Sequence, residues 1–188
     1  MRTMDVGELY HSLKIENIVA SGRVAEALDI EFLSGALDGC VLNKKKFPGA
    51  IYHMKVPKIA LLLFSSGKIV MTGISNKDEF HEGLATIVRQ LQQHGIQTLE
   101  SPDVVISNMV CSYDSGNFIN LNKVVLTLSH ERVEYEPEHF PGLVYRIDDP
   151  QVVALLFSSG KFILTGAKKI EDVKLAIDYL EERLKQIQ

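Results

Sequence analysis

An internal repeat is the feature of this sequence that most constrains its fold. Residues 47–73 read FPGAIYHMKVPKIALLLFSSGKIVMTG, and residues 140–166 read FPGLVYRIDDPQVVALLFSSGKFILTG. The two segments align without a gap at an offset of 93, and 14 of their 27 positions are identical. Upstream, IENIVAS at 15–21 corresponds to VISNMVCS at 105–112. Two copies of so long a unit do not suit a solenoid, in which many short repeats stack. The repeat therefore predicts a duplicated domain with a pseudo-twofold axis.

The repeat accounts for nearly all of the 188 residues. We expect a short N-terminal segment at 1–14, a first repeat at 15–100 and a second repeat at 101–188. The net charge of −4 arises in the second half, which holds 9 Lys/Arg and 13 Asp/Glu, whereas residues 1–100 hold 11 of each. An acidic chain argues mildly against nucleic-acid binding. Because the acids are concentrated in one half, a neutral or basic face elsewhere is still compatible with this total.

Composition excludes several classes of protein. No run of 18 apolar residues is present, so a transmembrane helix is not expected. The opening residues lack the apolar stretch of a secretory signal. The two cysteines, Cys40 and Cys111, are too few for a disulfide scaffold or a four-cysteine zinc site, and they suit a reducing cytoplasm.

Apolar runs separated by turn residues predict strands. The runs 59–64 and 68–74 flank Ser-Ser-Gly and predict a β-hairpin, with Gly67 available for a positive φ. Phe-Pro-Gly introduces a further strand at 47–56 and another at 140–147. We expect each half to begin with one short strand upstream of these elements.

Helical periodicity appears once in each half. Apolar residues recur at helical spacing over 77–95 and over 169–187, and Gly95 is expected to end the first helix. Weaker patterns at 27–37 and 120–128 leave those segments open. Antiparallel strands with helices covering one face constitute an α+β fold.

The two-residue period of a strand assigns side chains to opposite faces. In the first hairpin, Lys68, Val70 and Thr72 share a face opposite Ile69 and Met71. The second hairpin has the same alternation, with Lys161, Ile163 and Thr165 opposite Phe162 and Leu164. Both faces are apolar, but the long helices can cover only one of them. The other is therefore predicted to be an interaction surface.

Together these motifs resemble the TATA-box-binding protein family. The markers are ENIV and NMV, the twin FPG…Y segments, the twin LLFSSGK hairpins, the twin TG endings and EYEPE before the second FPG. The resemblance covers about 15–187 and is closer to archaeal than to eukaryotic members, and it makes 27–37 helical. It implies a saddle-shaped, tandem-duplicated α+β fold. A curved antiparallel sheet would place its concave side on the minor groove, and the helices would lie on the convex side.

The resemblance also implies a function. The chain is expected to be a general transcription initiation factor, not an enzyme. It would bind A/T-rich double-stranded promoter DNA, bend it, and recruit transcription factor B and, indirectly, RNA polymerase. It would need no cofactor, metal, small-molecule substrate or membrane. Its expected location is the nucleoid in an archaeal cytoplasm, or the nucleus in a eukaryote.

Site residues follow from the resemblance position by position. The wedges that unstack the end base steps would be Phe47, Phe64, Phe140 and Phe157. The amides that donate to minor-groove acceptors would be Asn17 and Asn108. Hydrogen bonds would be added by Thr72 and Thr165. Apolar contacts with the groove floor would come from Val19, Val70, Val110 and Ile163.

The remaining implied contacts involve charge. Phosphates would be held by Ser66, Lys68, Arg146, Ser159 and Lys161, which fix the register without reading sequence. Transcription factor B would meet the carboxylates of Glu134, Glu136 and Glu138. Because these three alternate, they would point the same way in an extended segment, outward from the DNA.

Some positions depart from the family pattern and keep alternatives open. His53 stands where the second repeat has Arg146, while Gln151 and Ile74 stand where the family often has basic residues. These departures favour, as an alternative, a divergent paralogue that acts mainly as a protein-interaction regulator of transcription. A third possibility, an enzyme or ligand-binding α/β domain, rests on fold-level analogy alone. SSGK lacks the remaining residues of a phosphate-binding loop, and the histidines show no metal-binding spacing.

Overall fold

The computed structural model describes residues 10–187, so residues 1–9 of the expected N-terminal segment lie outside the described part. The chain forms two compact units. One unit is Asn17–Ser107, and the other combines Met1–Glu16 with Asn108–Gln188. We call them the first unit and the second unit.

Within the described residues, the strands of the first unit are hydrogen-bonded in the order β2-β3-β4-β5-β1, and those of the second unit in the order β6-β10-β9-β8-β7. The strands of the first unit are β2 (Cys40–Leu42), β3 (Ala50–Met54), β4 (Ile59–Leu63) and β5 (Lys68–Ile74). Those of the second unit are β7 (Val133–Glu134), β8 (Leu143–Ile147), β9 (Val152–Leu156) and β10 (Lys161–Ala167). Two strands, β1 (Lys14–Ala25) and β6 (Thr98–Asp114), contribute residues to both units.

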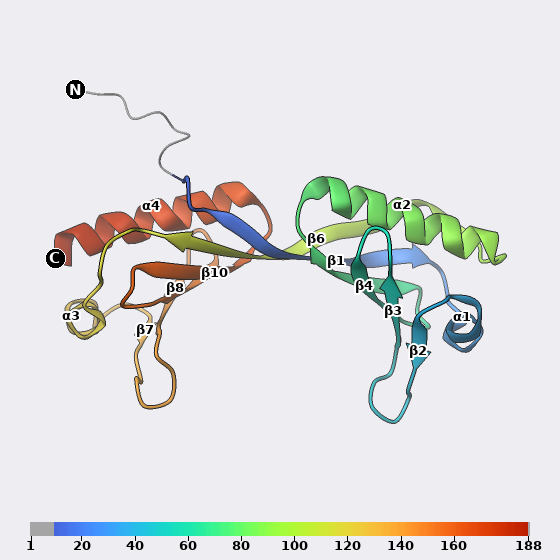
Figure 1. Ribbon diagram of the computed structural model, residues 1–188, viewed down its shortest axis with the longest axis horizontal. Helices are drawn as coiled ribbons and strands as arrows, with labels where there is room; N and C mark the ends of the chain where they lie inside the picture. The colour runs from blue at the N-terminus through green and yellow to red at the C-terminus, as the bar shows by residue number, and fades with distance from the viewer. Residues whose placement is uncertain (1–9, 188) are drawn as a thin grey trace, which may run out of the picture. The chain divides into compact units, whose positions relative to one another are not determined.

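Each unit contains one short and one long helix. The helices are α1 (Ile30–Ala36) and α2 (Lys77–Gln93) in the first unit, and α3 (Leu121–Thr127) and α4 (Ile170–Ile187) in the second. In each unit the long helix lies along one side of the strands, and the loop between the edge strand and its neighbour projects away from it (Figure 1). These loops are the first stirrup (residues 43–49, between β2 and β3) and the second stirrup (residues 135–142, between β7 and β8).

Side-chain caps explain why the weak patterns form helices. The carboxylate of Asp29 accepts a hydrogen bond from the N–H of Phe32, and the side chain of Asn120 accepts one from Lys123. Such caps satisfy N–H groups that the first turn leaves without partners. The helix that the resemblance implies at 27–37 is confirmed over Ile30–Ala36, and the segment left open at 120–128 is helical over Leu121–Thr127.

The predicted hairpins are confirmed. In the first unit β4 pairs antiparallel with β5, and Gly67 adopts φ 82° in the connecting turn. In the second unit β9 and β10 pair in the same way. The strands predicted at 47–56 and 140–147 are shorter than expected, because Phe-Pro-Gly lies in the stirrups. The opening strands are longer than predicted, since β1 and β6 run through both units.

Burial follows the predicted alternation. Ile69 and Met71 are fully buried, whereas Val70 and Thr72, which alternate with them, are half-buried. Phe162 and Leu164 are likewise fully buried in the second unit. On the buried side, α2 packs against β5, and α4 packs against β9 and β10. The opposite face of each unit keeps its half-exposed apolar side chains.

Both cysteines lie in the core as free thiols. Burial raises the pKa of the Cys111 thiol to about 11, and burial also raises that of Cys40. Among residues 10–187, no group of three or more His, Cys, Asp or Glu side chains is placed to hold a metal ion. None of the described helices is long and apolar enough to cross a membrane.

We predict that both thiols resist alkylation in the folded protein. A thiolate is the reactive species, and burial keeps these groups protonated and out of contact with reagent. At pH 8, iodoacetamide should label Cys40 and Cys111 much more slowly than in urea-unfolded protein, as measured by mass spectrometry. Equal labelling rates with and without urea would contradict the buried placement.

Candidate nucleic-acid interface

The half-exposed face of the first unit is a continuous row of small and apolar side chains. Val70 lies opposite Leu62 on one neighbouring strand and opposite Ser21 on the other. Leu62 in turn lies opposite Ile51. Cross-strand partners point to the same face, so these four side chains form one row. Val19, two residues before Ser21 on β1, is also half-buried.

The second unit repeats this row with close counterparts. Ile163 lies opposite Leu155 and Ser112, and Leu155 lies opposite Val144. Val110, a predicted contact residue, lies opposite Thr165. Each unit thus presents an apolar strip with hydroxyl groups at intervals.

The side chain of Asn17 is held in one orientation by two hydrogen bonds. The backbone N–H of Gly73 donates to Asn17 Oδ1 at 2.8 Å, and Asn17 Nδ2 donates to Thr72 Oγ1 at 3.2 Å. A primary amide carries two N–H donors, so one remains for an external acceptor. The amide oxygen is fixed by the backbone, and the half-buried side chain therefore presents a donor.

The second unit holds Asn108 in the same way. The N–H of Gly166 donates to Asn108 Oδ1 at 2.7 Å, and Asn108 Nδ2 donates to Thr165 Oγ1 at 3.2 Å. The twin Thr-Gly endings therefore have a structural role that sequence reasoning missed: the glycine N–H orients the asparagine. Only the cross-strand register brings these residues together, about 55 positions apart in the sequence.

The four predicted wedge residues form two aromatic pairs. Phe47 and Phe64 lie with ring centroids 5.6 Å apart at an interplanar angle of 62°. Phe140 and Phe157 lie 5.9 Å apart at 69°. Both are edge-to-face contacts, the arrangement that aromatic rings favour. Phe140 is 39% exposed, so this pair is partly open to solvent.

A glycine makes room for each aromatic pair. A Cβ atom on Gly49 would lie 2.8 Å from the carbonyl oxygen of Leu63 and 2.9 Å from the Phe47 ring, and one on Gly142 would lie 2.7 Å from the Phe140 ring. These distances are shorter than normal contacts, so any larger residue would displace a ring. In the Phe-Pro-Gly motif, the phenylalanine thus provides a ring of the aromatic pair, and the glycine, which has no side chain, leaves room for that ring.

Most of the residues predicted to contact phosphate are exposed, but one of them already forms an ion pair within the protein. Lys68, Lys161, Ser66 and Ser159 are exposed at the hairpin turns. Arg146, however, forms an ion pair with Glu134 at 3.5 Å between Nε and Oε1.

Sequence reasoning missed Arg23, which lies opposite Lys68 on the neighbouring strand. Its guanidinium donates to the carbonyl of Ser66 at 3.0 Å. The residue opposite Lys161 in the second unit is Asp114, so the two units differ in charge here. The only sequence signal for Arg23 is its position at the end of the first strand, which becomes informative once the register is known.

The segment that carries Glu134, Glu136 and Glu138 is not extended along its whole length. β7 ends at Glu134, and a turn follows in which the N–H groups of His139 and Phe140 donate to the carbonyl of Glu136. The extended segment on which the expectation depended is therefore interrupted. Glu134 lies opposite Val144, on the half-exposed face, rather than away from it.

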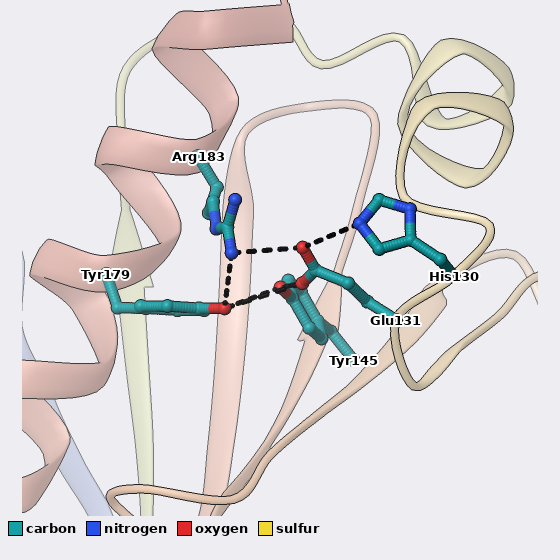
Figure 2. A network of polar contacts seen from close by, with 5 residues as sticks. All are labelled: His130, Glu131, Tyr145, Tyr179 and Arg183. Atoms are coloured by element: carbon teal, nitrogen blue, oxygen red, sulfur yellow. Dashed lines mark hydrogen bonds and ion pairs between the residues drawn. The ribbon is translucent and has the colours of Figure 1, made fainter.

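A polar network fixes the loop that leads into the second stirrup (Figure 2). Glu131, whose side chain is only 13% exposed, pairs with Arg183 on α4 at 3.1 Å. Its other carboxylate oxygen accepts hydrogen bonds from the hydroxyls of Tyr145 and Tyr179. Burial and the hydrogen bond to Glu131 raise the pKa of Tyr145, so its hydroxyl remains a donor. The loop is thereby tied to both a strand and the long helix.

Comparison with known proteins places this geometry in context. The sequence model of a family described as "Transcription factor TFIID (or TATA-binding protein, TBP)" matches residues 12–94 and 103–187. TATA-box-binding protein 1 of Methanosarcina acetivorans is 44% identical over 92% of this chain and 94% of that protein. The TATA-box-binding protein of Haloarcula marismortui is 45% identical over 94% of this chain and 95% of that protein. The structure of Methanococcus jannaschii TBP matches with a TM-score of 0.85 and 40% identity, over 94% of this chain and 99% of that one.

We predict that Gly49→Ala and Gly142→Ala separate the aromatic pairs. The added methyl group would overlap a ring, and overpacking of this kind typically costs about 1–3 kcal/mol. Thermal unfolding should show the loss, and ring contacts in NMR spectra should weaken. Gly35→Ala is the matched control, because a Cβ there meets nothing within 4 Å. Retention of both ring contacts in the Gly142 variant would contradict the steric argument.

Proposed function

The chain belongs to the TATA-binding protein family of general transcription factors, and from that premise we propose that it binds the minor groove of A/T-rich promoter DNA and bends it. The observation that carries the proposal is the paired asparagine geometry. Each amide is held by a glycine N–H so that a donor faces outward from an apolar strip.

Minor-groove chemistry fits this arrangement. Both A·T and T·A pairs present only acceptors in the minor groove, adenine N3 and thymine O2. Asn17 and Asn108 would donate to these acceptors, with Thr72 and Thr165 beside them. A G·C pair adds the guanine amino group, which would bring a donor against a donor and a polar group against Val19, Val70, Val110 and Ile163. The strips would therefore prefer A/T-rich sequence.

The aromatic pairs supply a means of bending. Unstacking a base step costs a few kcal/mol, and the bent duplex contacts more protein surface in return. Phe47 with Phe64, and Phe140 with Phe157, would each insert at one end of the box. Lys68, Lys161, Ser66, Ser159 and Arg146 would hold phosphates, Arg146 after exchanging its contact with Glu134.

An acidic chain can bind DNA in this mode. Recognition through apolar fit and DNA deformability needs few neutralised phosphates. The net charge of −4 is therefore compatible with the proposal.

We predict that Asn17→Ala and Asn108→Ala reduce sequence preference. A buried hydrogen-bonding group left unpaired costs about 1–3 kcal/mol, so affinity for an A/T box should fall by about that amount. Affinity for a G/C-rich duplex should change little. Gel shifts with both duplexes at one stated salt concentration measure this, and circular dichroism checks that the variants fold. Equal losses on both duplexes would reduce the asparagines to positioning groups, and absence of any A/T preference in the unaltered protein would refute the proposed function.

We further predict that Phe64→Ala combined with Phe157→Ala abolishes or sharply reduces the bend. Without the rings nothing replaces the stacking energy lost at the kinked steps. Energy transfer between dyes at the two ends of a short duplex reports the bend. An unchanged transfer efficiency at saturating protein would remove the wedge role from these residues.

Recruitment of transcription factor B, and through it RNA polymerase, is the second part of the proposal. Glu136 and Glu138 are exposed in the second stirrup, where a basic protein surface could reach them. Glu134 is the less favourable candidate, because Arg146 already neutralises it. Its expected partner role stays a prediction.

Charge reversal tests the recruitment. Glu136→Lys with Glu138→Lys should leave the binary DNA complex intact or slightly tighter. The same change should weaken binding of transcription factor B to the preformed complex, because rim charges steer association. Glu82→Lys with Glu182→Lys makes the same change in net charge on exposed helix positions. Identical titrations for the stirrup variant and the unaltered protein would exclude these carboxylates from the contact.

One observation favours the alternative of a paralogue that mainly regulates other transcription factors. His53 occupies the first-unit position of Arg146, and Arg146 itself is engaged by Glu134, so the grip on phosphate is weak at both places. The gel shift separates the two functions. Since the relatives are archaeal, we propose that the protein works at the nucleoid in the cytoplasm.

A further inference from the structure

The two stirrups share a backbone turn but carry opposite charge. In the first stirrup, the N–H groups of Lys46 and Phe47 both donate to the carbonyl of Asn43, at 2.9 and 3.0 Å. In the second, His139 and Phe140 donate to Glu136 at the same two distances. The repeat therefore matches Lys45 with Glu138 and Lys46 with His139. The backbone is equivalent, and the difference lies in the side chains.

The lysines of the first stirrup are not all used within the protein. Lys44 forms an ion pair with Glu31 on α1. Lys45 and Lys46 are exposed, and the ammonium group of neither forms a hydrogen bond or ion pair with another residue among 10–187. Two positive charges are thus available on a loop whose counterpart has two glutamates.

The position of Lys45 and Lys46 next to Phe47 indicates which partner they contact. Lys46 directly precedes Phe47, which packs against Phe64. If this pair inserts at the end of the box, as proposed above, the adjoining duplex lies beside the stirrup. Duplex DNA carries one negative charge for about every 1.7 Å of its axis, so phosphates lie within reach of a lysine side chain.

We propose that the first stirrup is a phosphate-binding site for the DNA that flanks the box, with Lys45 and Lys46 as its ligands and with no equivalent in the second stirrup. This inference rests on the proposed function and deepens it. The phosphodiester backbone is the occupant favoured over an acidic protein, because binding by Phe47 brings that backbone to the loop without a further partner. The electrostatic attraction between protein and DNA phosphates would then be stronger at the end of the box bound by the first unit than at the other end.

The salt dependence of binding tests this site. The variant is Lys45→Ala with Lys46→Ala, and the matched control is Lys77→Ala with Lys185→Ala, two exposed lysines on the long helices. Affinity is measured from 50 to 200 mM salt on an A/T box with ten flanking base pairs at each end, and on the same box without flanks. Each phosphate contact adds about 0.9 to the slope of log affinity against log salt concentration. If Lys45 and Lys46 each contact one phosphate, a fourfold rise in salt should lower the affinity of the unaltered protein about 12-fold more than that of the stirrup variant. The control variant should match the unaltered protein, and Lys45→Arg with Lys46→Arg should retain the steep slope.

Three outcomes would overturn the inference. An unchanged slope in the stirrup variant on the flanked duplex would show that these lysines contact no phosphate. A slope difference that persists without flanks would place the contacts inside the box. Equal slopes together with selective binding of poly-glutamate by the unaltered protein would assign the loop to an acidic protein partner. Loss of A/T preference in the unaltered protein is a separate result, which refutes the proposed function rather than this site.

Discussion

The two-residue period of the strands is the constraint on which the rest of the structure depends. One long helix per unit can cover only one side of its strands, so every strand must divide its side chains between a fully buried face and a half-exposed one. Ile69, Met71, Phe162 and Leu164 take the buried side. The apolar residues between them are left uncovered. A face that the protein does not bury itself is available for a partner that brings its own flat surface.

Much of this could be predicted from the sequence, because it depends on local patterns. The hairpins, the long helices and the division of faces in KIVMTG and KFILTG follow from spacing alone. The lengths of β1 and β6 could not be predicted in this way, since their pairing partners lie far away in the chain. The outward alternation of Glu134, Glu136 and Glu138 required an extended segment, and a turn after β7 interrupts the strand. The ion pair between Glu134 and Arg146 likewise depends on cross-strand register.

The orientation of the asparagine side chains is another feature that local sequence patterns cannot predict. An asparagine in a strand has no preferred amide orientation that sequence can reveal. The direction of Asn17 is decided by the N–H of Gly73, which only the fold brings within 2.8 Å. Since this N–H holds the amide before any ligand arrives, little rotamer entropy is lost on binding. Sequence resemblance can identify such a residue as a candidate, but only the folded chain fixes its amide so that an N–H can donate a hydrogen bond to a ligand.

The network around Glu131 has a consequence for how a duplicated protein diverges. The corresponding carboxylate in the first unit, Asp38, is exposed and pairs with Lys55, while Tyr52 there donates to Gln90. The two polar clusters share no residue, and each is built from residues of its own half. A substitution in one therefore leaves the other undisturbed, and such independent sites contribute additively to stability. After duplication, one half can therefore acquire a new surface while the other half retains the original one, because their polar clusters do not depend on each other.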